Sequence, residues 1–133
     1  MQTTFSGEQA FAFSAVGSMC LVSMINGKMS ENEIEEIYIQ IHQSDRMSTQ
    51  TEFSLEALDN LKERLEINYH QTQASLLSEM REIHFEHDQA VEIINMALDV
   101  IKSNKEIPVE KIDVLSGLCK VLNIYSDEFN FAT

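Results

Sequence analysis

The sequence predicts an all-α domain, a compact bundle of six to seven helices built from two pseudo-repeated helical hairpins. Apolar residues recur at spacings of three and four along nearly the whole chain, as on the buried face of a helix. The strict alternation of apolar and polar residues that marks a strand is never sustained. The opening segment also has a diverged second copy 78 residues later. The length of 133 residues is typical of one domain, so we expect a single domain over 1–133.

The first expected helix covers residues 10–25, AFAFSAVGSMCLVSMI, and carries no charge. It is shorter than the ~20 residues that span a bilayer, and no basic segment precedes it as in a secretory leader. It also contains Ser14, Gly17, Ser18 and Ser23. We therefore predict a buried central helix and no direct membrane insertion.

The remaining helices follow from apolar spacing. The positions that mark them are Ile34, Ile37, Tyr38 and Ile41; Leu58, Leu61 and Leu65; Leu76, Leu77, Met80 and Ile83; Ala90, Ile94, Ala97, Leu98 and Ile101; and Ile112, Leu115, Leu118, Cys119 and Leu122. The helix around Ile94 is apolar over most of its circumference, which indicates a second central helix.

The joints are predicted from polar and capping residues. Residues 43–53, QSDRMSTQTEF, are polar and aperiodic, so we expect a mobile surface loop. Ser54 is expected to begin the helix that follows. Ser126 is expected to cap a final short turn that carries Phe129.

The turn of the first hairpin lies in residues 25–37, INGKMSENEIEEI. Asn26 and Gly27 both tolerate the left-handed conformation that ends a helix. Ser30 and Glu33 match the S-x-x-E capping box that starts one. The segment is therefore predicted as a helix stop, a tight turn and a capped restart.

The same segment resembles the end of a calcium-binding loop, with Gly27 sixth and Glu33 twelfth. That register places Val22 and Met24 at ligand positions, where their apolar side chains cannot bind calcium. A standard EF-hand is therefore excluded.

The second copy reads SNKEIPVEKIDVL over residues 103–115. It sets Asn104 at the position of Asn26 and Lys111 at the position of Glu33. Pro108 is predicted at the first helical position, where its missing N–H costs nothing. The architecture this implies is two hairpins whose long first helices pack together in the middle.

An apolar helix, an asparagine–glycine turn, and an acidic helix with glutamate six residues beyond the glycine, all repeated, resemble the TerB-like (tellurite-resistance) domain family. The resemblance covers most of the chain, and the two hairpins carry it. It implies a bundle of about seven helices and an intracellular module, soluble or membrane-associated, linked to metal and envelope stress.

The family resemblance also implies that acidic residues at the two turns bind a divalent metal. The matching positions here are Asn26, Glu33 and Asn104, with Lys111 as the partner of Glu33 in the second copy. The chain thus departs from the family pattern by asparagine at both aspartate positions and lysine at one glutamate position. No other cofactor is expected.

The charge balance of 22 acids to nine bases gives a formal net charge of −13. Nucleic acid and anionic lipid would repel such a chain, so we expect a protein partner of basic character. The acidic residues Glu31, Glu35 and Glu36 beside the first turn are the predicted interaction surface. The oligomeric state is left open.

Sulfur-containing residues are expected in the core. Cys20 and Cys119 are far apart in apolar contexts, which indicates reduced core residues of a cytoplasmic protein. The methionines Met19, Met24 and Met29 could instead form an adaptable binding surface, but core packing is the more common role.

The best alternative cluster is residues 81–88, REIHFEHD. On one continuous helix His84, His87 and Asp88 would share a face suited to zinc. We expect the segment to straddle a joint between two helices, which breaks that spacing.

Catalytic motifs are absent: the sequence has no HExxH, GxSxG, P-loop or GxGxxG. The prediction is a non-enzymatic intracellular interaction or stress-response module. The alternative is a divalent-metal-binding protein that uses the hairpin turns.

Overall fold

A computed structural model describes residues 7–125, and every regular element in that range is helical. The elements are α1 (Gly7–Met24), α2 (Glu31–Gln43), the 3₁₀ helix η1 (Asp45–Met47), α3 (Thr51–Ile67), α4 (Tyr69–Arg81), α5 (His87–Lys102) and α6 (Val109–Val121). The prediction of an all-α helical bundle is confirmed.

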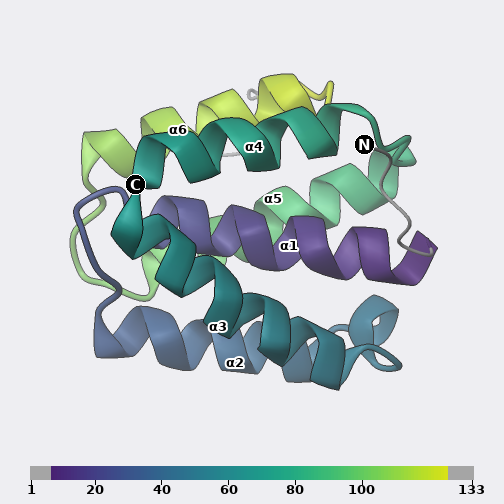
Figure 1. Ribbon diagram of the computed structural model, residues 1–133, viewed down its shortest axis with the longest axis horizontal. Coiled ribbons are helices and arrows are strands. Elements are labelled where there is room, and N and C mark those ends of the chain that lie inside the picture. Colours follow the sequence, from purple (N-terminus) through teal and green to yellow (C-terminus); the bar gives the residue numbers. More distant parts are fainter. Residues whose placement is uncertain (1–6, 126–133) are drawn as a thin grey trace.

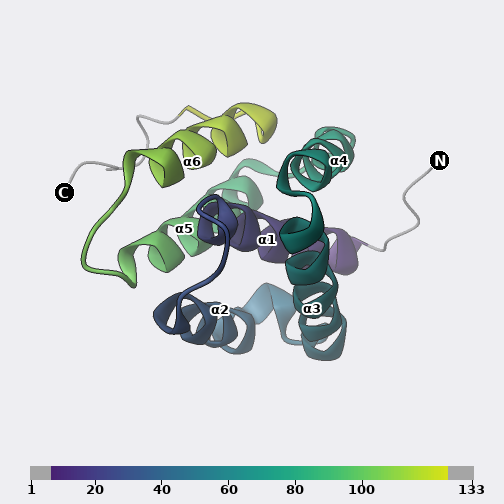
Figure 2. The same ribbon diagram turned by 60° about the vertical axis from the view of Figure 1, so that its left-hand side comes forward.

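The helices form three layers (Figures 1 and 2). α2 and α3 make one outer layer, α1 and α5 the middle, and α4 and α6 the other outer layer. α1 and α5 pack against each other, and each contacts helices in both outer layers. This arrangement confirms that the uncharged segment 10–25 is a buried central helix, and that the first helices of the two hairpins meet in the middle.

The repeat is visible in the helix boundaries. α6 begins and ends 78 residues after α2, and α5 ends 78 residues after α1. Each hairpin therefore consists of one middle-layer helix and one outer helix, joined by a turn of the same length.

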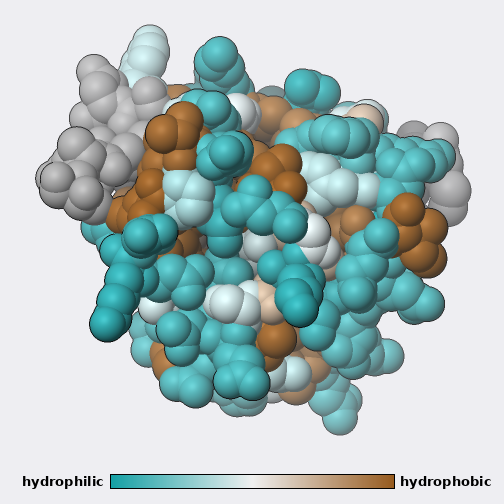
Figure 3. All heavy atoms as spheres, turned by 90° about the vertical axis from the view of Figure 1, so that its left-hand side faces the viewer, coloured by the Kyte–Doolittle hydropathy of each residue, from teal (hydrophilic) through white to brown (hydrophobic). Residues whose placement is uncertain are grey.

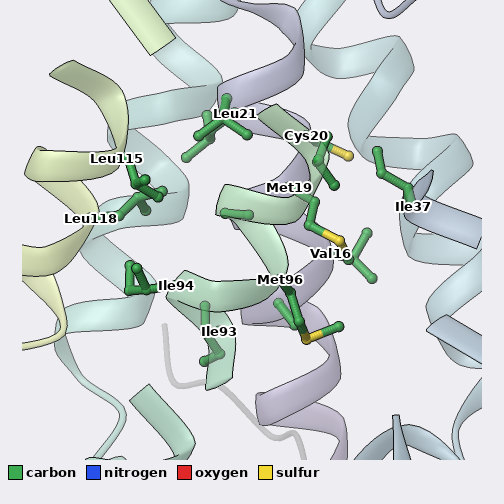
Figure 4. Packing of buried hydrophobic residues seen from close by; sticks show 14 of the residues in the cluster. Val16, Met19, Cys20, Leu21, Ile37, Ile93, Ile94, Met96, Leu115 and Leu118 are labelled. Carbon is green, nitrogen blue, oxygen red and sulfur yellow. The ribbon is translucent and has the colours of Figure 1, made fainter. Parts of the chain in front are cut away.

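The core lies between the middle layer and its neighbours (Figure 4). The labelled side chains come from four helices: Val16, Met19, Cys20 and Leu21 from α1, Ile37 from α2, Ile93, Ile94 and Met96 from α5, and Leu115 and Leu118 from α6. Met19, Met24 and Met29 are all buried, which confirms the predicted core role.

Both cysteines are buried and unpaired, as predicted. Burial raises the pKa of the Cys20 thiol to about 12, although the positive charge of Lys62 acts in the opposite direction. Cys20 is therefore a neutral thiol in the folded protein at ordinary pH.

The segment 43–53 differs from the predicted mobile loop. It contains η1, whose Met47 is fully buried, and it ends in the first turn of α3. Ser54 does not begin α3 but lies inside it, where its hydroxyl donates to the carbonyl oxygen of Gln50 at 2.7 Å. The same hydroxyl chemistry serves a helix cap or a bond to the preceding turn, so the residue type alone did not distinguish them.

Other boundaries shift by one or two residues. Pro108 is the N-cap residue of α6 and not its first helical residue. Ile83 follows the end of α4. The predicted turn of Ser126 and Phe129 lies outside the described residues. Over residues 7–125, no helix has both the length and the apolar character needed to cross a bilayer.

Candidate functional site

The turn between α1 and α2 has the predicted geometry. Gly27 has φ +113° and its N–H donates to the carbonyl oxygen of Met24 at 2.9 Å. The N–H of Glu33 donates to Ser30 Oγ at 3.2 Å, and the N–H of Ser30 donates to Glu33 Oε1 at 2.9 Å. The capping box is thus complete.

The second carboxylate oxygen of Glu33 forms an ion pair with Lys111 on α6. The two residues occupy the same position in the two copies, 78 residues apart, and they are 1% and 5% exposed. Ser30 Oγ also lies 3.2 Å from Asn104 Oδ1, as its donor, in the turn of the second hairpin. Equivalent points of the two hairpins are therefore joined by a buried ionic contact and a hydrogen bond.

The residues predicted as metal ligands are only partly brought together. Glu33 and Asn104 belong to one network through Ser30, whereas Asn26 is exposed in the α1–α2 turn. The only carboxylate of the set already pairs with Lys111, whose ammonium would repel a divalent cation at the same oxygen.

The alternative metal cluster at residues 81–88 is divided as expected. α4 ends at Arg81 and α5 begins at His87, so His84 lies in the joint. Among residues 7–125, no group of three or more His, Cys, Asp or Glu side chains is placed to hold a metal ion.

An acidic groove of about 610 Å³ lies between the C-terminal half of α2, η1 and α5. It is lined by Gln40, Gln43, Ser44, Asp45, Arg46, Asp88, Val91, Glu92, Asn95, Met96 and Asp99. Four carboxylates thus face one guanidinium group, and polar amides fill much of the remaining wall.

One end of the groove is neutralised by Arg46. Its Nε donates to Glu92 at 2.7 Å and its Nη2 donates to Asp88 at 2.8 Å. The hydrogen bond to Glu92 is the main cause of a raised Arg46 pKa, with Asp88 contributing in the same direction. The guanidinium carbon also lies 5.8 Å from the centre of the Phe11 ring. Arg46 is thus held in place and consumed by this end of the groove.

The other end holds two carboxylates that share one amide. Gln40 Nε2 donates to Glu36 Oε2 at 2.7 Å and to Asp99 Oδ2 at 3.1 Å. Neither carboxylate has a basic partner among residues 7–125. We call Glu36, Gln40 and Asp99 the acidic triad. An amide satisfies hydrogen bonds but supplies no charge, so the two negative charges of the triad remain uncompensated.

Of the predicted interaction residues, only Glu36 belongs to this groove; Glu31 and Glu35 are exposed elsewhere on α2. Sequence reasoning missed Gln40 and Asp99, which are 59 residues apart in the chain. The repeat contains a signal for them, because their equivalents in the other copy are Leu118 and Leu21. A polar residue in one copy and a leucine in the other mark a position where the two hairpins have diverged.

Comparisons of the chain with protein-family models, with curated proteins and with solved structures found no match. The resemblance to the TerB-like family therefore stays a prediction.

Proposed function

We propose that the protein is a non-enzymatic interaction module whose acidic groove between α2 and α5 receives a basic segment of a partner protein. The acidic triad carries this proposal, because Glu36 and Asp99 are brought together without a positive charge. An arginine or lysine side chain of a partner would supply that charge.

The geometry of the triad suits a guanidinium group. Gln40 bonds to one oxygen of each carboxylate, so the second oxygen of Glu36 and of Asp99 can accept from a ligand. A planar guanidinium presents several N–H donors in a fixed fork and can bond to both carboxylates together. Gln40 is only 5% exposed, so the amide that fixes the pair is itself held in the protein.

The charge of the whole chain supports the same type of partner. A net charge of −13 attracts a basic ligand over a distance and repels nucleic acid. The unpaired state of Cys20 and Cys119 supports a cytoplasmic location, since cysteine pairing is favoured in oxidising compartments. A TerB-like role in stress response rests on the family resemblance alone.

The experiment is a fluorescence anisotropy titration of a labelled oligoarginine peptide in about 150 mM salt. The test variant is Glu36→Gln with Asp99→Asn, which removes both charges and keeps an acceptor oxygen at each position. The control variant is Glu56→Gln with Glu63→Gln, which removes the same number of exposed charges from α3.

We expect the test variant to bind about five- to thirty-fold more weakly than the wild type, as two partly exposed ion pairs contribute about 1 to 2 kcal/mol in total. The control should change affinity less than about twofold, because screened charges elsewhere contribute little. Equal losses in both variants would show that the peptide responds to net charge and not to the triad.

A further inference from the structure

A second groove, of about 350 Å³, lies between α4 and α6 over the C-terminal end of α1. It is lined by Leu21, Ile25, Gln73, Leu77, Glu110, Asp113, Val114, Gly117 and Leu118. Figure 2 shows α4 and α6 side by side above α1, and Figure 3 shows apolar surface in the upper half of the face where both helices begin. We call this the α4–α6 groove.

The α4–α6 groove has an apolar floor and an acidic edge. Leu21 and Leu118 are buried at its base, while its walls include the partly exposed side chains of Ile25, Leu77 and Val114. The exposed carboxylates of Glu110 and Asp113 lie on the α6 side. The groove therefore combines apolar contacts with a negative edge.

Gly117 keeps this groove open. It lies inside α6, where glycine costs about 0.5 to 1 kcal/mol relative to alanine. A Cβ atom at this position would have no heavy atom within 4 Å, so packing inside the chain does not require the glycine. The missing side chain leaves space at the surface that a ligand can occupy.

The repeat shows that the fold does not demand an apolar groove here. The α4–α6 groove occupies the position in the second copy that the acidic triad occupies in the first. The equivalent pairs are Glu36 and Val114, Gln40 and Leu118, and Asp99 and Leu21. The same site of the hairpin has thus become charged in one copy and apolar in the other, which indicates two ligands of different chemistry.

We propose that the α4–α6 groove binds an amphipathic helix of a partner protein, with apolar side chains in the groove and Lys or Arg beside Glu110 and Asp113. The walls are helices whose backbone groups are already paired, so an added strand would find no sheet edge. A helix presents apolar residues at spacings of three and four, which match a groove between two helices. This inference uses residues outside the acidic groove and does not depend on that groove.

The acidic edge decides between occupants. A second copy of this chain would bring a further −13 of charge toward the same carboxylates. An anionic membrane surface would be repelled for the same reason. A basic amphipathic helix is the occupant that both the floor and the edge attract.

The test uses a labelled peptide of ~14 leucines and lysines with leucine at helical spacing, and a scrambled peptide of identical composition that has no apolar face. Binding to the full chain is followed by anisotropy. Gly117→Leu fills the groove at a position with free space, so the fold is retained; circular dichroism and thermal melting check this. Glu36→Gln with Asp99→Asn serves as the control at the other groove.

The patterned peptide should bind the wild type and the acidic-groove variant equally, within about twofold, and Gly117→Leu about tenfold or more weakly. Equal binding of patterned and scrambled peptides, no binding at all, or no effect of Gly117→Leu would overturn the proposal. A concentration-dependent dimer in light scattering that Gly117→Leu abolishes would overturn it in favour of a second copy.

Discussion

The buried ion pair between Glu33 and Lys111 can be tested by replacing Lys111 with methionine. Methionine has a similar length and fills the same space, but it leaves the Glu33 carboxylate 1% exposed and without its counter-charge. Glu33 would keep its capping bond to the Ser30 N–H, so the N-terminus of α2 is unaffected in the first instance. The perturbation therefore isolates the ionic contact between the two hairpins.

The magnitude follows from the burial of both groups. Removing one partner of a buried pair costs about 3 to 5 kcal/mol, because the remaining charge is desolvated without compensation. An unfolding entropy of about 2.1 cal/mol/K per residue gives about 0.28 kcal/mol/K for 133 residues. Lys111→Met should therefore lower Tm by about 11 to 18 °C.

The assay is calorimetry together with urea unfolding of the wild type, Lys111→Met, Glu33→Gln and the double variant. Glutamine at position 33 keeps an acceptor for the capping box but removes the charge. The double variant should recover most of the loss, to within about 1 to 2 kcal/mol of the wild type, since neither an unpaired charge nor a cavity remains. A Lys111→Met variant with wild-type Tm, or a double variant no more stable than Lys111→Met, would refute the account of this contact.

Four further results are expected. Gly27→Ala should lose at least about 1 kcal/mol in urea unfolding, because its φ of +113° is unfavourable for alanine. Gly117→Ala should gain about 0.5 to 1 kcal/mol, because it adds helix propensity without a clash. The Cys20 thiol, neutral in the fold with its pKa raised from 9.0 to about 12, contributes stability that is complete below pH 9 and lost as pH rises toward 12. Unfolding free energy should fall about 1.3 kcal/mol more between pH 8 and 10 for the wild type than for Cys20→Ala. Chelation of divalent metal should leave Tm unchanged, and a large upward Tm shift with one metal that Glu33→Ala abolishes would support metal binding at the turns.

Short-range patterns carried most of the fold prediction. The capping box at Ser30 and Glu33, the Gly27 turn and the uncharged helix 10–25 each depend on residues close in sequence, and each has the predicted structure. The 78-residue repeat extended this to the tertiary level, because equivalent helices of two similar hairpins meet around the middle layer.

The errors occurred where one residue decides the structure. Met47 is fully buried among polar neighbours, so no periodic pattern marks the segment that it anchors. Ser54 has the residue type of a helix cap but bonds to the turn before it. A single buried side chain or a single hydrogen bond leaves no periodic signal in a sequence.

The candidate site could be predicted only in part. Lys111 was recognised as a positive charge at a glutamate position, but the repeat register also places it opposite Glu33, which explains the ion pair. Glu36 was predicted as an interaction residue, whereas Asp99 joins it from 63 positions further along the chain through the Gln40 amide. Contacts of this kind depend on how α2 packs against α5, which no local pattern determines.

The most direct test of the proposed acidic groove is the NMR spectrum of the full chain during titration with oligoarginine. The side-chain NH₂ signals of Gln40 and the backbone amide of Asp99 should shift first and furthest, because the peptide binds at the carboxylates that Gln40 joins. The amide of Gly117, in the apolar groove, should stay in place. Shifts that gather on α3 around Glu56 and Glu63, with the Gln40 signals unmoved, would contradict the account.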